Sequence, residues 1–72
     1  MNDRERVEKD MEMFEENLSK YHPKGEKEKE IVDMAVRYFE DAKFYLERGD
    51  IMTAFGCINY AHGLLDALIK LE

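Results

Sequence analysis

The sequence predicts an all-α protein, an up-down-up antiparallel three-helix bundle with helices at about residues 3–20, 24–48 and 51–71. Apolar residues recur at helical spacing in three long segments, and short connections separate those segments. The 72 residues contain only one proline and four glycines. Short connections make successive helices antiparallel neighbours. A chain of this length forms one domain, residues 1–72, with a small core that benefits from oligomerisation.

The first expected helix begins after Asn2, which can form a capping box with Glu5. Its apolar residues fall at steps of three and four and make one narrow seam: Val7, Met11, Phe14, Leu18 and Tyr21. Met13 lies off this seam. Charged residues fill the other positions, and Glu16 and Lys20 stand at a favourable i,i+4 spacing.

The second expected helix starts near Lys24, because Pro23 cannot continue a helix but suits the first turn of a new one. Gly25 then falls inside that turn, which we expect to fray. The apolar seam of this helix consists of Ile31, Met34, Ala35, Tyr38, Ala42, Tyr45 and Leu46. Phe39 and Phe44 lie off the seam or at its edge.

The segment Arg48–Asp50 ends the second helix and starts the third. Gly49 is the expected left-handed stop, and Asp50 is the expected N-cap of the next helix. The same three residues spell an adhesion tripeptide, which would need an extracellular protein and an open loop. The capping chemistry on both sides favours the helix stop.

The third expected helix is more apolar than the other two. Apolar positions cover about two-thirds of its circumference, which is more than a helix facing two neighbours needs. A narrow strip of other residues completes it: Gly56, Asn59, Gly63, Asp66 and Lys70. We expect a second copy of the chain to cover the surplus apolar side, giving a homo-oligomer, with a dimer favoured. The candidate interface residues are Cys57, Tyr60, Leu64, Ala67 and Leu71. The alternative is that this helix is sunk more deeply than its neighbours.

Three polar residues of the third helix, Asn59, His62 and Asp66, can touch one another because they stand three and four residues apart. An aspartate that orients a histidine could serve acid–base chemistry or bind a metal. A metal site needs three or four converging ligands, and the usual paired spacings are absent. We therefore expect a solvated helix edge at which His62 hydrogen-bonds Asp66, no catalytic residue, no metal and no cofactor.

Composition excludes several other classes of function. The formal net charge of −6 and the scattered basic residues argue against nucleic-acid and anionic-membrane surfaces. The charged start of the sequence lacks the apolar core of a signal peptide, and the longest apolar run is too short to span a bilayer. The single cysteine, Cys57, has no partner in the chain. We therefore expect a soluble cytoplasmic protein.

The segment from Met34 to Leu68, MAVRYFEDAKFYLERGDIMTAFGCINYAHGLLDAL, resembles a small archaeal family catalogued only as a domain of unknown function, number three-five-seven. The residues that carry the resemblance are Ala35, Tyr38, Asp41, Ala42, Leu46, Gly49, Asp50, Ala54, Phe55, Asn59, Tyr60, Ala61, Gly63, Leu65, Asp66 and Ala67. The resemblance implies a compact helical fold and an archaeal cytosolic setting, and it brings no known activity. The hairpin is also similar to tetratricopeptide-type hairpins and HEPN domains. The chain does not repeat the helical hairpin, as tetratricopeptide proteins do, and it lacks the closely spaced Arg and His of the HEPN ribonucleases.

The sequence thus favours a non-enzymatic helical interaction module that self-associates through its third helix or binds an unidentified protein partner. The alternative is a small-ligand or nucleotide-binding domain with a groove beside Asn59, Tyr60, His62 and Asp66. A third possibility is that the first helix detaches, so that a partner helix docks onto the other two.

Overall fold

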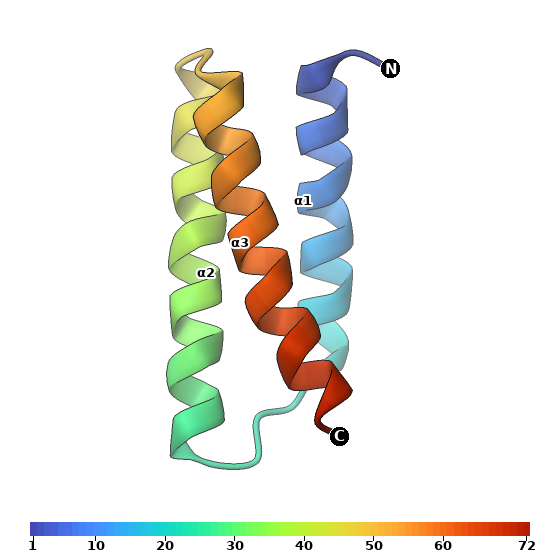
Figure 1. Ribbon diagram of the computed structural model, residues 1–72, viewed down its shortest axis with the longest axis vertical. Coiled ribbons are helices and arrows are strands. Elements are labelled where there is room, and N and C mark those ends of the chain that lie inside the picture. Colours follow the sequence, from blue (N-terminus) through green and yellow to red (C-terminus); the bar gives the residue numbers. More distant parts are fainter.

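The computed structural model describes residues 1–72 and contains three helices and no strand: α1 (Asp3–Lys20), α2 (Glu26–Glu47) and α3 (Ile51–Lys70). Figure 1 shows that α1 runs down the molecule, α2 runs up and α3 runs down again. The predicted all-α class and the up-down-up three-helix bundle are confirmed. None of the helices combines the length and the hydropathy that crossing a membrane requires.

The third helix occupies the centre of the bundle. It packs extensively against α2 and also against α1, whereas α1 and α2 contact each other only slightly. In Figure 1, α3 accordingly lies between the other two helices along most of its length. A helix with two neighbours buries a wide apolar stripe, so this central position accounts for much of the apolar surface of α3 but not for the surplus beyond two neighbours.

A single core of twelve buried residues joins the helices. Its members are Val7, Phe14, Tyr21, Ala35, Phe39, Ala42, Leu46, Ala54, Ile58, Ala61, Leu65 and Leu68. Four of them are alanines with no exposed surface, two on α2 and two on α3. Small side chains let two helix backbones approach closely, which fits the extensive packing of α2 on α3.

The prediction that Phe39 lies off the seam or at its edge is wrong. Its side chain is 7% exposed, and its ring stacks on that of Phe14 with centroids 5.2 Å apart. Phe39 is four residues after Ala35 and three before Ala42, so all three lie on one face of α2. The stacked pair joins α1 to α2.

The helix ends follow the capping rules. Asn2 accepts a hydrogen bond from the Glu5 amide, and the Glu5 carboxylate accepts one from the Asn2 amide, as predicted. Gly49 has a φ of 82°, in the left-handed region that favours glycine. Asp50 caps α3 by accepting a hydrogen bond from the Thr53 amide.

The start of α2 differs from the prediction. Gly25 is its extended N-cap residue and Glu26 its first helical residue, so the helix begins two residues later than expected. Pro23 lies in the connection and not in the first turn of α2. Glycine is an acceptable N-cap residue, and the predicted fraying turn is therefore not part of the helix.

A candidate interaction surface

His62 points from α3 toward α1. Its Nε2 atom lies 2.8 Å from the backbone carbonyl oxygen of Asp10, to which it donates a hydrogen bond. Its ring also meets Phe14 edge to face, with centroids 5.8 Å apart. The expected hydrogen bond from His62 to Asp66 is not formed. The contacts with α1 explain why this bond is missing. They hold the imidazole between α3 and α1, and not along the surface of α3 where Asp66 lies.

The other polar residues near His62 do not form a site with it. Asn59 and Asp66 are exposed, as the solvated-strip prediction requires. Tyr60 lies on another side of α3, where its ring meets that of Tyr38 on α2 at a centroid distance of 4.5 Å. None of the cavities in the structure is lined by any of the four residues of the predicted groove. No group of three or more His, Cys, Asp and Glu side chains is placed to hold a metal ion.

The five candidate interface residues form one row beside α2, four of them in α3 and Leu71 at its C-cap. Tyr60 is 50% exposed and Leu71 is 82% exposed, and Ala67 is exposed as well. Cys57 and Leu64 are half-buried and pack against the core. Apolar surface therefore remains open on this side of α3 after α3 has packed on both neighbours.

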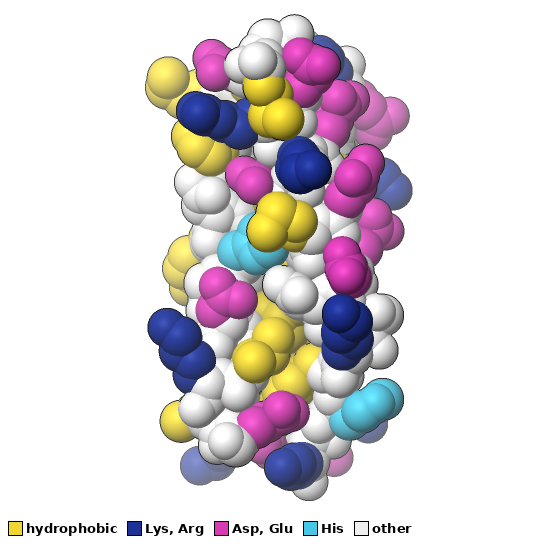
Figure 2. Space-filling model, turned by 90° about the vertical axis from the view of Figure 1, so that its right-hand side faces the viewer, with side chains coloured by type: hydrophobic (Ala, Val, Ile, Leu, Met, Phe, Trp, Pro, Cys, Tyr) yellow, Lys and Arg dark blue, Asp and Glu magenta, His cyan; other side chains and the backbone are white.

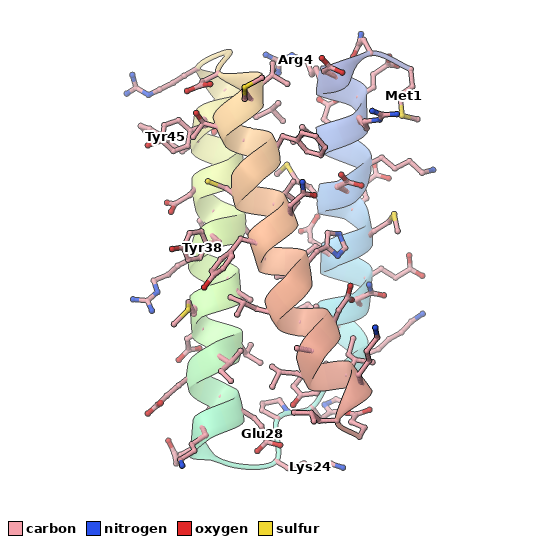
Figure 3. The ribbon with its side chains drawn as sticks, in the orientation of Figure 1. Met1, Arg4, Lys24, Glu28, Tyr38 and Tyr45 are labelled. Carbon is pink, nitrogen blue, oxygen red and sulfur yellow. The ribbon has the colours of Figure 1, made fainter.

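A residue of α2 extends this open surface. Tyr38, which the sequence places in the packing seam of its helix, is 36% exposed and meets Tyr60 edge to face. Figure 3 shows Tyr38 and Tyr45 on α2, on the side of the molecule that is remote from α1. The sequence pattern marks Tyr38 as apolar-facing, but it does not show that α1 leaves this part of the seam uncovered.

The only thiol of the chain borders the same surface. Burial raises the pKa of Cys57, and the negative charges of Asp41 and Asp50 raise it further. The effect of Asp41 agrees with its position on α2 beside this row. A raised pKa keeps the thiol protonated near neutral pH, so Cys57 behaves as a small apolar side chain and not as a nucleophile.

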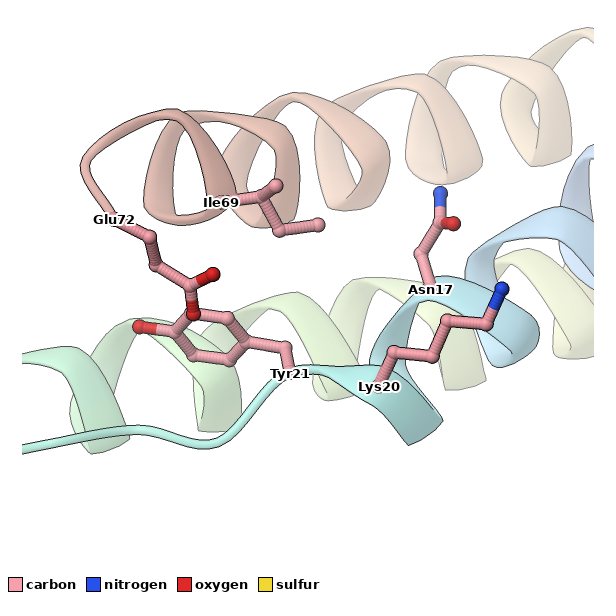
Figure 4. Close-up of a pocket in the computed structure, with 5 residues that line it drawn as sticks. All are labelled: Asn17, Lys20, Tyr21, Ile69 and Glu72. Carbon is pink, nitrogen blue, oxygen red and sulfur yellow. The ribbon is translucent and has the colours of Figure 1, made fainter.

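Two cavities lie elsewhere, along the junction of α1 with α3. The first, of about 210 Å³, is drawn in Figure 4 and is lined by Asn17, Lys20, Tyr21, Ile69 and Glu72. Burial raises the pKa of the Tyr21 hydroxyl there, and the negative charges of Glu28 and Glu72 add to this effect. The second, of about 370 Å³, lies at the other end of the junction and is lined by Asp3, Arg6, Ile51, Met52 and Phe55.

The row of five candidate interface residues differs from the rest of the surface in its lack of charged side chains. Figure 2 shows the face that includes α1, where acidic and basic side chains occur along the whole length and hydrophobic ones appear in separate groups. The α3 row contains no charged residue, although charged residues make up 39% of the chain. This row can therefore contact another apolar surface without bringing its own charges into the contact.

Residues 5–72 match the model of a family described as "Protein of unknown function (DUF357)". The match covers nearly the whole chain, and the protein belongs to this family. The resemblance in the second half of the sequence is thereby confirmed and extends through α1. A search of curated proteins found no match.

Proposed function

We propose that this member of the DUF357 family is a non-enzymatic interaction module that pairs with a second copy of itself through the open apolar side of α3. One observation carries the proposal. Tyr60 and Leu71 remain exposed beside the half-buried Cys57 and Leu64, although α3 already packs against both other helices. Contiguous exposed apolar surface on a small protein commonly marks an interaction site.

Charge favours a second copy as the partner. The chain carries a formal net charge of −6, and most of its surface is charged, so two copies repel each other over most orientations. Along the uncharged row of α3 they can approach without opposing like charges. A two-fold dimer uses the same patch on both copies, and an apolar row is complementary to itself.

Size favours the same partner. The core contains twelve buried residues, and the lack of a disulfide or metal leaves few other ways to stabilise so short a chain. Pairing would remove additional apolar area from water, at about 25 cal/mol per Å². The lone, protonated thiol suits the reducing cytosol, where we place the protein.

Sedimentation equilibrium over a hundredfold range of concentration tests the proposal. We expect a reversible dimer for the natural chain and a monomer of unchanged helicity for Tyr60→Glu, because the substitution would place a charge in the interface of each copy. Tyr60 is a better position than Leu64, whose side chain also packs against the core.

The matched control is Met13→Glu. Met13 is 46% exposed on α1, outside the proposed interface, and the change introduces the same charge. It should leave the dimer intact. A natural chain that stays monomeric throughout the range, or a Tyr60→Glu chain that dimerises as well as the Met13→Glu chain, would refute the proposal.

A further inference from the structure

The open surface comprises two rows of residues, one on each of two neighbouring helices. The α2 row consists of Ile31, Met34, Tyr38, Asp41 and Tyr45, and the α3 row of Cys57, Tyr60, Leu64, Ala67 and Leu71. Both rows advance by alternating steps of three and four residues, which is the spacing of the seams in helical bundles. The rings of Tyr38 and Tyr60, which meet edge to face with centroids 4.5 Å apart, join the rows near the middle of both helices. We call these two rows together the two-helix face.

Burial shows that the two-helix face is an outward continuation of the core, because Ile31, Tyr45, Cys57 and Leu64 pack against the core while the other members reach the surface. The buried residues of α2 and α3 lie on the side of each helix next to the two-helix face, where the other helices of the bundle cover them. The members of the two-helix face are half-buried or exposed. Tyr38, Asp41, Tyr60, Ala67 and Leu71 are exposed in the bundle. No other element of the chain therefore covers the outer side of these two rows.

The area of the two-helix face suits a weak, reversible dimer. Each row spans 15 residues, about 21 Å of helix, and two packed helices are about 20 Å wide, which gives about 400 Å² per copy. Two such faces bury about 800 Å² in total, in the range of weak, transient protein interfaces. The row on α3 alone offers about half of that area, so the row on α2 is needed to reach it.

The chemistry of the face suits a second copy. Asp41 is its only charged residue, in a chain that is 39% charged and has a formal net charge of −6. The tyrosine pair supplies large rigid rings, which are frequent at the centres of interfaces. Two helices that pack on two equivalent helices form a four-helix bundle, the usual arrangement for seams with this spacing.

We infer that the dimer is a four-helix bundle in which α2 and α3 of each copy pack face to face, with Tyr38 and Tyr60 at its centre and α1 of each copy on the outside. The inference rests on the proposed self-association and adds to it the participation of α2. It assigns a binding role to Tyr38, Met34 and Tyr45, and it leaves α1 free of contact with the second copy.

Substitutions on α2 test this arrangement, with the dissociation constant of the dimer measured by sedimentation equilibrium. Tyr38→Glu should raise the dissociation constant at least tenfold, the same change that we expect for Tyr60→Glu. The matched control is Val36→Glu on the same helix, because Val36 is only partly buried and lies about 160° from Tyr38 around the helix axis, away from the two-helix face. This control should stay within threefold of the natural chain. Far-UV circular dichroism checks that each variant remains helical.

The results distinguish this inference from the proposed function. If Tyr60→Glu dissociates the dimer and Tyr38→Glu does not, the interface follows α3 alone, so the four-helix arrangement is wrong while self-association stands. If the natural chain is monomeric, both are wrong. Should Tyr38→Glu fail to fold, Tyr38→Ser removes the ring without adding a charge. A rise of about fivefold or more in its dissociation constant supports the inference, and an unchanged value overturns it.

Discussion

Phe14 shows how one side chain connects the whole molecule. It has no exposed surface, stacks on Phe39 of α2 and meets His62 of α3 edge to face. The two partners are 25 and 48 positions further along the chain than Phe14. Aromatic pairs in these geometries contribute about 0.5–1.5 kcal/mol beyond the burial of their area. Phe14 therefore links all three helices at one point.

Cys57 gives a residue-scale prediction for pH. Its pKa is raised by burial, and more weakly by Asp41 and Asp50, so the folded chain holds the thiol proton more tightly than the unfolded chain does. The resulting stability is fully present below the ordinary thiol pKa and is lost as the pH rises through the folded value. We expect the free energy of unfolding, measured by urea titration at a fixed protein concentration, to decline above about pH 8.5.

The Cys57→Ala chain is the control for this titration. It lacks the thiol, so its free energy of unfolding should decline less steeply just above about pH 8.5. The pKa of Tyr21 is also raised, mainly by burial and further by Glu28 and Glu72, so a decline near the ordinary tyrosine pKa should persist in both chains. Identical curves for the two chains over the whole range would show that Cys57 contributes nothing to the pH dependence.

At the scale of the helices, α1 is the element with the least packing. Its backbone lies close mainly to α3 and approaches α2 at only a few positions, whereas α2 and α3 pack extensively on each other. Two hydrogen bonds connect α1 to the other helices. His62 of α3 donates one to the Asp10 carbonyl oxygen, and Arg4 donates one to the Leu46 carbonyl oxygen of α2 at 3.0 Å. Figure 3 shows Arg4 at the end of the molecule where α1 begins.

This difference in packing predicts that α1 unfolds locally before α2 and α3 do. Local stability follows the number of buried apolar contacts, so the amides of α1 should exchange with deuterium before the buried amides of α2 and α3. Hydrogen-exchange mass spectrometry resolves the three helices by peptide. Early exchange confined to α1 would also support a transient detachment of that helix. Equal protection of all three helices would mean that the bundle opens only as a unit.

At the scale of the whole molecule, net charge opposes association. Two copies that each carry a formal charge of −6 repel, and the screening length falls from about 30 Å at 0.01 M salt to about 10 Å at 0.1 M. Because the two-helix face is almost uncharged, salt screens this repulsion without weakening the apolar contact. We expect the dissociation constant of the dimer to fall as sodium chloride is raised from 0.02 to 0.3 M. A dissociation constant that rises with salt would instead indicate an interface held by ion pairs.

Most of the fold could be predicted because its signals are local. The capping box at Asn2, the left-handed Gly49 and the N-cap at Asp50 depend on residues only a few positions apart, and all three are present. The spacing of apolar residues likewise predicted the three helices, and the short connections predicted their up-down-up order. Gly25 was misplaced because glycine suits both an N-cap and, at a cost, a helical turn.

The candidate site depended on information that periodicity does not contain. Periodicity identifies apolar faces, but it does not say which neighbour covers each face. The sequence by itself determined that α3 is apolar over most of its circumference and that Asn59 and Asp66 face water. Only the tertiary structure decided that Phe39 is buried, that His62 turns to Asp10 and that Tyr38 joins Tyr60. The physical reason is that these contacts join separate helices, whose relative positions are set by side-chain packing across the whole core and not by any local pattern.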